Sequence, residues 1–378
     1  MSIVQGTRYS DTDTLNIGID MSSTLDMMSP FDVPLLQLIG KDSLSTPCVA
    51  VKHEWLEDGL RSLDTALATQ GEFSGTGAIT TSTVTAGDGE LLRAGDILKI
   101  EDELIILTAT PLTDDILTAT RAFGGSTAAA HVTLTPMYVV GNVNLQNAGV
   151  GASRSTIKTA RFNNTQIFED AIVVTSTLQA IKKYVEQDEM SAQLERAVRL
   201  AWVQMERTLL HGKKVAPTYA VAGAMDGILP LITPNAYAKG GLALTEEYVL
   251  QALQDCWTYG GRPTHVFVNA FQKRQMNKFL DSMRMTTRTD RIAGAVVDTY
   301  SSDFGTVNIV LDRNMPTDTV LIIEASRIGF GPLTDHALKV IDIPQTTGLK
   351  NTKQLYGQYT SETRDLKAHA KITGLSTS

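Results

Sequence analysis

Cysteine and histidine are scarce in this chain of 378 residues. The two cysteines, Cys48 and Cys256, stand far apart, so they give no disulfide framework and favour a reducing compartment. The six histidines fall on separate predicted elements, and none has a second histidine at metal-ligand spacing. The composition therefore predicts neither a metal site nor a disulfide-rich fold.

Catalytic and cofactor motifs are also missing. The chain holds no Cys-x-x-Cys, His-Glu-x-x-His or Gly-x-Ser-x-Gly pattern. Gly40-Lys41 and Gly212-Lys213 lack the upstream glycine of a phosphate loop, and Gly75-Thr76-Gly77 lacks the third glycine of a dinucleotide fingerprint. We therefore expect no cofactor and no enzyme activity, and an enzyme whose site is assembled from distant residues stays as an alternative.

Long apolar runs are absent as well. The longest, such as 104–107, are too short to span a bilayer, and the polar N-terminus lacks the apolar core of a secretory signal. The proportions of hydrophobic residues (43%) and charged residues (20%) are those of a globular protein. A net charge of −8 disfavours tight, general binding to DNA. That charge is also typical of an ordinary cytosolic protein.

The clearest element that is present is a long amphipathic helix after Asp188. Asp188 is a plausible N-cap, and Gly212 stands where a helix-ending residue is expected. Steps of three and four residues place one apolar stripe on this helix, whereas the opposite face is charged. The stripe holds Met190, Leu194, Ala197, Val198, Ala201, Trp202, Met205, Leu209 and Leu210, and the charged face holds Glu195, Arg196, Arg199, Glu206 and Arg207. We expect the stripe to pack on a sheet built from the C-terminus.

Further elements alternate between helix and strand. We expect a short helix at 61–69, a strand at 171–175, and a turn at 178–181 capped by Ser176 or Thr177. Strands are also expected at 225–230, 265–268, 293–299, 306–311 and 319–324, and at 336–343, 354–360 and 363–372 under the long helix. Helices are expected after Thr245, with Val249, Leu250, Leu253 and Trp257 as its apolar stripe, and after Asn269 through about Met283.

A Gly- and Thr-rich region from Gly71 to Gly151 has a different character. Turn-punctuated β-prone runs at 97–100, 103–110, 115–120 and 137–140 predict a small all-β module. From Ala122 to Ser153 the chain has no Asp, Glu, Lys or Arg, although a solvated segment normally carries several. This stretch is therefore either the core of the module or a surface covered by another subunit.

Six segments, in a fixed order along the chain, carry a family resemblance: Pro30–Leu36, His53–Asp58, Asn163–Phe168, Val173–Thr177, Glu189–Gly212 and Ala368–Leu375. Together they resemble the SU10-like group of tailed-phage major capsid proteins, which have the HK97-type shell fold. It implies an α+β, HK97-like capsid fold. The implied function is self-assembly into pentamers and hexamers of an icosahedral phage head around double-stranded DNA.

The resemblance also implies a division into domains. The N-terminal arm would comprise 1–44, the E-loop 45–69 and 150–175, and a β insertion within that loop 70–149. The P domain would comprise 176–224 and 336–378, and the A domain 225–335. The implied location is the virion, after assembly in the host cytoplasm. Scaffold, portal and decoration proteins would be further partners, contact with packaged DNA would be weak, and no membrane is involved. A decoration or tube protein is the main alternative.

Candidate subunit contacts come from charges and aromatics near the proposed E-loop. Its outgoing side is acidic and its return side basic, so the charges either pair across strands or between subunits, or are simply solvated. Phe31 and Trp55 are candidate interface anchors, whereas Trp202 is better explained by core packing. The expected contact residues are Phe31, Glu54, Trp55, Glu57, Asp58, Arg154, Lys158 and Arg161. No catalytic, cofactor-binding or metal-binding residue is expected.

A basic region at 273–291 leaves two interpretations open. It holds Lys273, Arg274, Lys278, Arg284, Arg288 and Arg291 against Asp281 and Asp290. Contact with phosphate or with an acidic neighbouring subunit is the functional interpretation. A solvated helix face and loop is the simpler and favoured one, because no aromatic residue is interleaved for stacking on bases.

Overall fold

Two compact units make up the chain in the computed structural model. The first comprises Met1–Trp55 and Arg161–Ser378, and the second comprises Leu56–Ala160. The structure describes residues 31–40, 42–60, 62–68, 79–86, 88–111, 115–146, 149, 155, 157–181, 188–283, 288–292, 295–344 and 348–377.

Helix α3 (Glu189–His211) is the longest helix of the first unit, as predicted. Oδ1 of Asp188 accepts hydrogen bonds from the backbone N–H groups of Met190 and Ser191, and the helix ends at Gly212. Met205, Leu209 and Leu210 are fully buried, and Leu194, Val198 and Trp202 are partly buried against the core. The predicted apolar stripe is therefore the face that packs.

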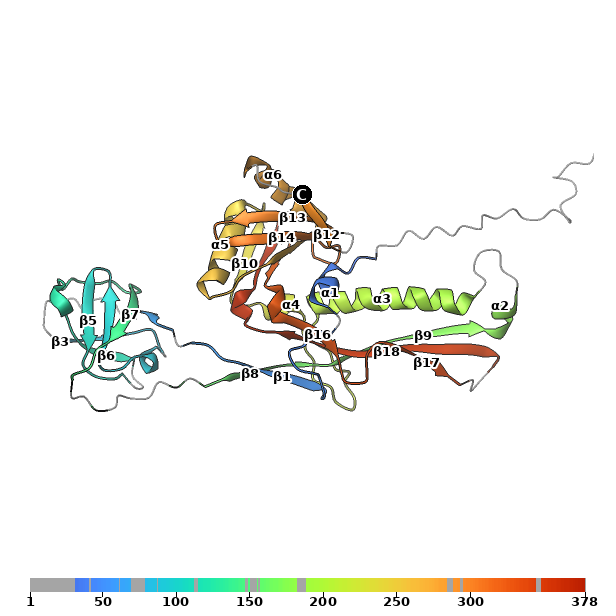
Figure 1. The fold of residues 1–378 in the computed structure, drawn as a ribbon, viewed down its shortest axis with the longest axis horizontal. Helices are drawn as coiled ribbons and strands as arrows, with labels where there is room; N and C mark the ends of the chain where they lie inside the picture. The colour runs from blue at the N-terminus through green and yellow to red at the C-terminus, as the bar shows by residue number, and fades with distance from the viewer. Residues whose placement is uncertain are drawn as a thin grey trace, which may run out of the picture. The chain divides into compact units, whose positions relative to one another are not determined.

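A four-stranded sheet lies along α3 (Figure 1). Its longest strand, β18 (Lys350–Thr363), pairs antiparallel with β9 (Gln166–Thr175) over ten residue pairs. β17 (Lys339–Ile343) and β16 (Ile328–Pro332) also pair antiparallel with β18. Ile172, Val174 and Leu355 of this sheet pack against α3, so the predicted platform under the helix is confirmed for β17 and β18.

A mixed seven-stranded sheet forms the other part of this unit. Its order is β10-β19-β15-β11-β14-β13-β12. The strands are β10 (Ala236–Leu242), β11 (His265–Val268), β12 (Arg288–Ile292), β13 (Ala295–Ser302), β14 (Gly305–Leu311), β15 (Val320–Ile323) and β19 (Ala370–Leu375). Helices α5 (Glu246–Thr258) and α6 (Ala270–Met283) accompany it, as predicted.

Both faces of this seven-stranded sheet are covered. On β11, Val266 and Val268 point into a core shared with α5 and α6, whereas Phe267 points into a core shared with α3. That second core also holds the short helices α1 (Pro34–Ile39) and α4 (Ile228–Leu231). Successive side chains of β11 thus alternate between two cores, which explains why all four residues of the strand are buried.

The second unit is a six-stranded antiparallel sheet with its own core, ordered β2-β7-β4-β5-β6-β3. Its strands are β2 (Asp64–Ala66), β3 (Ile79–Thr83), β4 (Asp96–Ile100), β5 (Glu103–Leu107), β6 (Ile116–Thr120) and β7 (Pro136–Asn142). The four predicted strands of the module are confirmed as β4 to β7. β1 (Lys52–Glu57) and β8 (Thr159–Asn164), which flank the module in sequence, pair with each other.

Several local predictions were wrong. The helix expected at 61–69 is strand β2, because these residues pair with β7. The strand expected at 225–230 does not form, because residues 228–230 belong to helix α4. Helix α2 (Ser176–Ala180) is capped by Thr175 rather than by Ser176 or Thr177. The last strand, β19, does not lie under α3, because it pairs with β10 and β15.

Two helix faces were also misassigned. Glu206 of α3 was expected on the charged face, yet it is fully buried. Trp257 of α5 was expected in the apolar stripe, yet 59% of it is exposed, and Ala252 and Cys256 are buried instead. In both helices the tertiary partners, rather than the periodicity alone, decide which positions face the core.

Candidate subunit-contact surfaces

The β1–β8 ribbon carries most of the predicted contact residues. The described ion pair of Glu54 is with Lys52 on its own strand rather than with the return strand. Trp55 is buried, and its ring centroid lies 6.1 Å from that of His53. Glu57 is partly buried, whereas Asp58, Lys158 and Arg161 are exposed. Arg154 lies outside the described residues. A role in subunit contact stays a prediction for all of these residues.

A buried polar junction joins the end of β8 to β18 and to the segment at 215–226, all within the first unit. The side-chain amide of Asn163 donates to the backbone oxygen and the hydroxyl of Ser361, each at 2.9 Å, and its Oδ1 accepts from Asp226 N–H at 2.8 Å. The amide of Asn164 donates to the carbonyl of Val215 at 3.0 Å. Sequence analysis assigned no contact to these asparagines. Their partners lie far away in sequence, and no local pattern identifies them.

Glu362 of β18 fastens the segment before β1. Glu362 is fully buried, and both of its oxygens accept from the Ser45 hydroxyl at 2.7 Å. Nε2 of His53 lies 3.7 Å from Oε2 of Glu362. Contact with the Cys48 thiol and then with Glu362 raises the pKa of His53 to about 9. Burial alone would raise the pKa of Glu362, but the neighbouring His53 and the hydrogen bonds from Ser45 outweigh it and lower that pKa.

Cys48, His53 and Glu362 together resemble the parts of a nucleophilic site, and sequence analysis missed this grouping. All three side chains are almost completely buried, and the thiol of Cys48 donates to the carbonyl of Ala50 at 3.2 Å. A nucleophile has to reach its substrate. The arrangement therefore serves to hold the chain before β1 against β18.

Helix α1 is anchored to α3 by a second buried carboxylate. Glu206 accepts hydrogen bonds from the backbone N–H groups of Leu35 (3.3 Å) and Leu36 (3.2 Å). Burial, and then the charge of Asp312, raises the pKa of Glu206 to about 8. Burial likewise raises the pKa of Asp312 to about 6, against an opposing hydrogen bond from Asn314. Oδ2 of Asp312 has no hydrogen-bond partner among the described residues.

Two open apolar grooves flank Trp202 of α3. The first has a volume of about 590 Å³ and is lined by Phe31, Val33 and Leu36 of the α1 region and by Val198 and Trp202. The second, of about 560 Å³, is lined by Trp202, Leu338, Val340 and Tyr359 among others. Phe31, one of the predicted contact residues, is 40% exposed at the first groove. Trp202 contributes to the core, as expected, because its ring packs edge-on against Tyr359.

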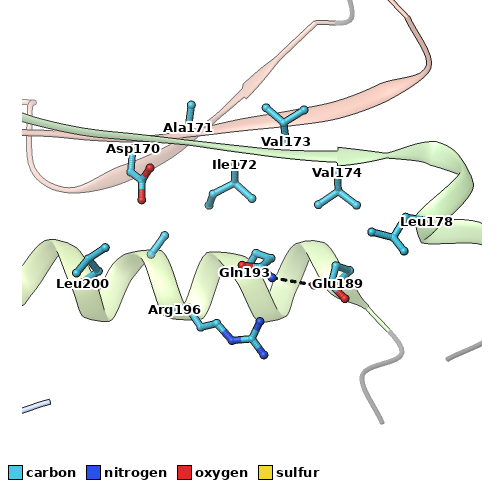
Figure 2. A pocket seen from close by; sticks show the side chains of 11 residues that line it. Asp170, Ala171, Ile172, Val173, Val174, Leu178, Glu189, Gln193, Arg196 and Leu200 are labelled. Atoms are coloured by element: carbon cyan, nitrogen blue, oxygen red, sulfur yellow. Dashed lines mark hydrogen bonds between the residues drawn. The ribbon is translucent and has the colours of Figure 1, made fainter. Parts of the chain in front are cut away.

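An open groove lies beside the N-terminal half of α3, which itself packs on the sheet through Met190 and Ala197. The groove has a volume of about 450 Å³ and is lined by Ile172 and Val174 on β9 and by Gln193, Ala197 and Leu200 on the helix (Figure 2). Gln193 donates to Glu189 one turn earlier at 2.8 Å rather than to the strand. Both halves of the helix therefore pack on the core, and the groove runs beside the N-terminal half.

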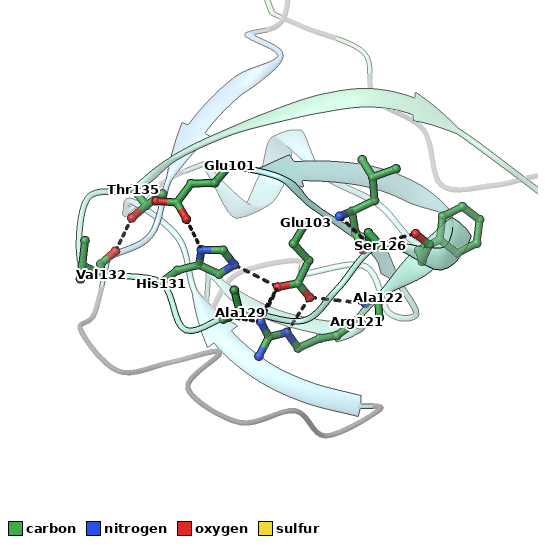
Figure 3. Close-up of polar contacts among 11 residues, drawn as sticks. Glu101, Glu103, Arg121, Ala122, Ser126, Ala129, His131, Val132 and Thr135 are labelled. Atoms are coloured by element: carbon green, nitrogen blue, oxygen red, sulfur yellow. Dashed lines mark hydrogen bonds and ion pairs between the residues drawn. The ribbon is translucent and has the colours of Figure 1, made fainter.

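The β module contains one buried ionic cluster (Figure 3). Glu103 accepts from Nε of Arg121 at 2.8 Å and lies 3.0 Å from Nε2 of His131, whose Nδ1 lies 3.1 Å from Glu101. The backbone N–H of Ala129 also donates to Glu103 at 3.1 Å. Burial opposes ionisation of Glu103, but the bonds from Arg121 and His131 dominate and lower its pKa to about 2. The cluster ties the loop after β6 to the β4–β5 hairpin.

The described part of the chain shows no candidate metal site and no candidate membrane-spanning helix. Within it, no group of three or more His, Cys, Asp or Glu side chains is placed to hold a metal ion. No helix there combines the length and the apolar character that a membrane span requires. Of the basic region, Lys273 is buried and Arg274 and Lys278 are exposed, whereas the side chains of Arg284, Arg288 and Arg291 lie outside the described residues.

Comparison with known proteins identifies the family of this chain. The family model of the SU10 major capsid protein matches residues 4–376. The chain belongs to the SU10 major capsid protein family. This membership confirms the predicted resemblance and favours a major capsid protein over a decoration or tube protein. No curated protein matches the sequence.

Solved structures agree on the HK97-like fold of this capsid protein. The capsid asymmetric unit of cyanophage A-1(L) aligns at a TM-score of 0.54 and 12% identity, covering 98% of this chain and 100% of that one. A structure from Microbacterium phage Oxtober96 gives 0.53 and 9%, covering 97% and 98%. A structure from Mycobacterium phage Bobi gives 0.52 and 9%, covering 99% and 100%. At these identities the likeness establishes the fold alone.

Proposed function

We propose that this capsid protein assembles as pentamers and hexamers into an icosahedral shell around double-stranded DNA. The observation that carries the proposal is the family match over residues 4–376. The fold agrees with a mechanical role, because its buried carboxylates hold segments of the chain together rather than lining an accessible pocket. We infer a structural rather than an enzymatic role, which the family match supports.

The proposed domains keep the boundaries predicted from sequence, with one addition. The separate core of Leu56–Ala160 supports a β insertion within the E-loop. β2 and Leu67 lie in the segment assigned to the E-loop, yet β2 pairs with β7 and Leu67 is fully buried in the core of the module. The insertion therefore extends to these residues. α3 serves as the spine of the P domain, and the seven-stranded sheet as the body of the A domain.

The remaining partners belong to the same proposal. The exposed Phe31 and the grooves beside Trp202 would be covered by neighbouring copies in the shell. The net charge of −8 supports weak contact with packaged DNA. Scaffold, portal and decoration proteins are the accessory partners, and assembly takes place in the host cytoplasm.

Expression with and without a co-expressed scaffold protein tests this function. Sedimentation velocity and negative-stain microscopy of the purified protein should reveal rings, sheets or closed particles. A protein that stays strictly monomeric in both conditions contradicts the proposal.

A further inference from the structure

The outer face of β7 in the β module is unusually apolar for an exposed strand. Met137 and Val139 face the core, so the alternate residues point away from it. Of these, Tyr138 is 44% exposed and Val140 is 61% exposed, and Leu134, just before the strand, is 71% exposed. All lie in the stretch from Ala122 to Ser153 that has no charged residue. The structure thus excludes the interpretation that this whole stretch is module core.

Charges flank this apolar strip in a defined order. Tyr138 pairs with Asp64 of β2 on one side and with Lys99 of β4 on the other. Residues directly opposite in a ladder share one face of the sheet, and Asp64 and Lys99 are both exposed. Across the strands, this face is therefore negatively charged at Asp64 of β2, apolar at Tyr138 of β7, and positively charged at Lys99 of β4. We call it the β7 face, comprising Asp64, Lys99, Leu134, Pro136, Tyr138 and Val140.

This order is self-complementary under one symmetry operation. A two-fold axis that runs in the interface along β7 places each β7 residue opposite its own copy. A charge on β7 would then meet a like charge, and the strip contains none. The same axis places Asp64 of each copy opposite Lys99 of the other copy, so two equivalent charge pairs form. A two-fold axis across the strands would instead oppose Asp64 to Asp64, so the charges select the first orientation.

We propose that the β7 face is a homotypic contact, in which modules of two neighbouring subunits pack face to face about a two-fold axis parallel to β7. The inference rests on the proposed assembly of this chain into a shell, because only there are copies of the module held near one another. A large exposed apolar patch otherwise favours aggregation. A contact between copies accounts for the apolar strip, the missing charges and the flanking pair together.

Charge complementation on the strip tests the homotypic contact. Val140→Asp and Val140→Lys each place a like charge against itself, and each alone should lower the yield of intact particles about ten-fold or more. Co-expression of the two variants should restore the yield, because opposite charges then meet. Ile116→Asp is the matched control, since Ile116 is an exposed apolar residue of the same module on β6 (46%) outside the charge-free stretch. It should leave the yield unchanged.

The flanking charges test the orientation of the axis. Asp64→Lys alone sets a like charge against Lys99 of the neighbouring copy and should lower particle yield. Adding Lys99→Asp reverses both charges and should restore it. Circular dichroism of dissociated subunits should be unchanged throughout, because all three substituted positions are exposed.

Each remaining outcome is decisive. Normal yields for both Val140 variants, or impaired yields that co-expression does not restore, overturn the homotypic contact while leaving the proposed shell function intact. Failure of the Asp64→Lys, Lys99→Asp double variant to recover overturns the two-fold arrangement. If the unaltered chain forms no particle, the proposed function fails and this inference fails with it.

Discussion

Glu206 and Asp312 are fully buried carboxylates, and the charge of Asp312 adds to burial in raising the pKa of Glu206. Glu206 also accepts hydrogen bonds from the N–H groups of Leu35 and Leu36, so its protonation state is linked to the packing of α1 against α3. The pair therefore makes the stability of the first unit depend on pH.

The first prediction concerns the direction of that dependence. A carboxyl whose pKa rises from 4.5 to about 8 on folding binds more protons in the folded state between these values. Its stabilising contribution is present at pH 4.5 and is lost as the pH rises toward 8. Glu206→Gln removes this titration, so the variant should gain stability relative to the unaltered subunit between pH 5 and 9, on the order of a few kcal/mol.

Urea midpoints of dissociated subunits across that pH range measure the effect. Glu195→Gln is the control, because Glu195 lies on the same helix with an exposed side chain paired to Arg199. Its curve should run parallel to that of the unaltered subunit. A Glu206→Gln curve that also runs parallel would show that Glu206 does not titrate in this window.

A second prediction tests which positions of α3 face the core. Leu209→Ala removes a fully buried side chain from the main core and should cost about 2–5 kcal/mol of unfolding free energy. Leu200→Ala on the same helix, at a position 51% exposed, should change it by less than about 0.5 kcal/mol. Trp202→Ala should fall below the roughly 3–5 kcal/mol of a fully buried tryptophan, because Trp202 is only partly buried. Urea titrations distinguish the three, and equal losses at 200 and 209 would contradict this packing.

The limits of sequence analysis appear at the same helix. Asp188, the steps of three and four, and Gly212 are local signals, and they place α3 correctly. Glu206 follows the same pattern as its exposed neighbours, and only the N–H groups of Leu35 and Leu36, about 170 positions away, account for its burial. Likewise, nothing within 61–69 reveals that β2 pairs with β7 rather than forming a helix. The β7 face could not be predicted from the sequence either, because it depends on the strand register that places Asp64, Tyr138 and Lys99 side by side.

The third prediction concerns the ionic cluster of the β module. Arg121→Met leaves Glu103 buried without its main cation and should cost about 3–5 kcal/mol within the module. Because the module has its own core, hydrogen exchange should rise in β4, β5 and β6 while α3 stays protected. Asp102→Asn, an exposed change in the adjacent turn, is the control. Loss of protection in α3 would show that the two cores unfold as one.

The fourth prediction concerns removal of the module. Replacing residues 59–157 with a short Gly/Ser linker should leave α3 folded, since loop length affects chain entropy only weakly and β1 and β8 still pair with each other. Replacing only 71–149 should be worse, because it strips the partners from β2 and from the fully buried Leu67. Circular dichroism and hydrogen exchange report the fold. If the variant that lacks only 71–149 is the more stable of the two, the proposed extension of the insertion to β2 and Leu67 is contradicted.

Cryo-electron microscopy of purified particles tests whether this chain forms the shell wall. We expect a closed icosahedral wall of pentamers and hexamers, in which every wall subunit fits α3 lying on the β9–β18–β17 sheet. A wall formed by a different protein, with this chain bound only on its outside or arranged as a helical tube, would contradict it.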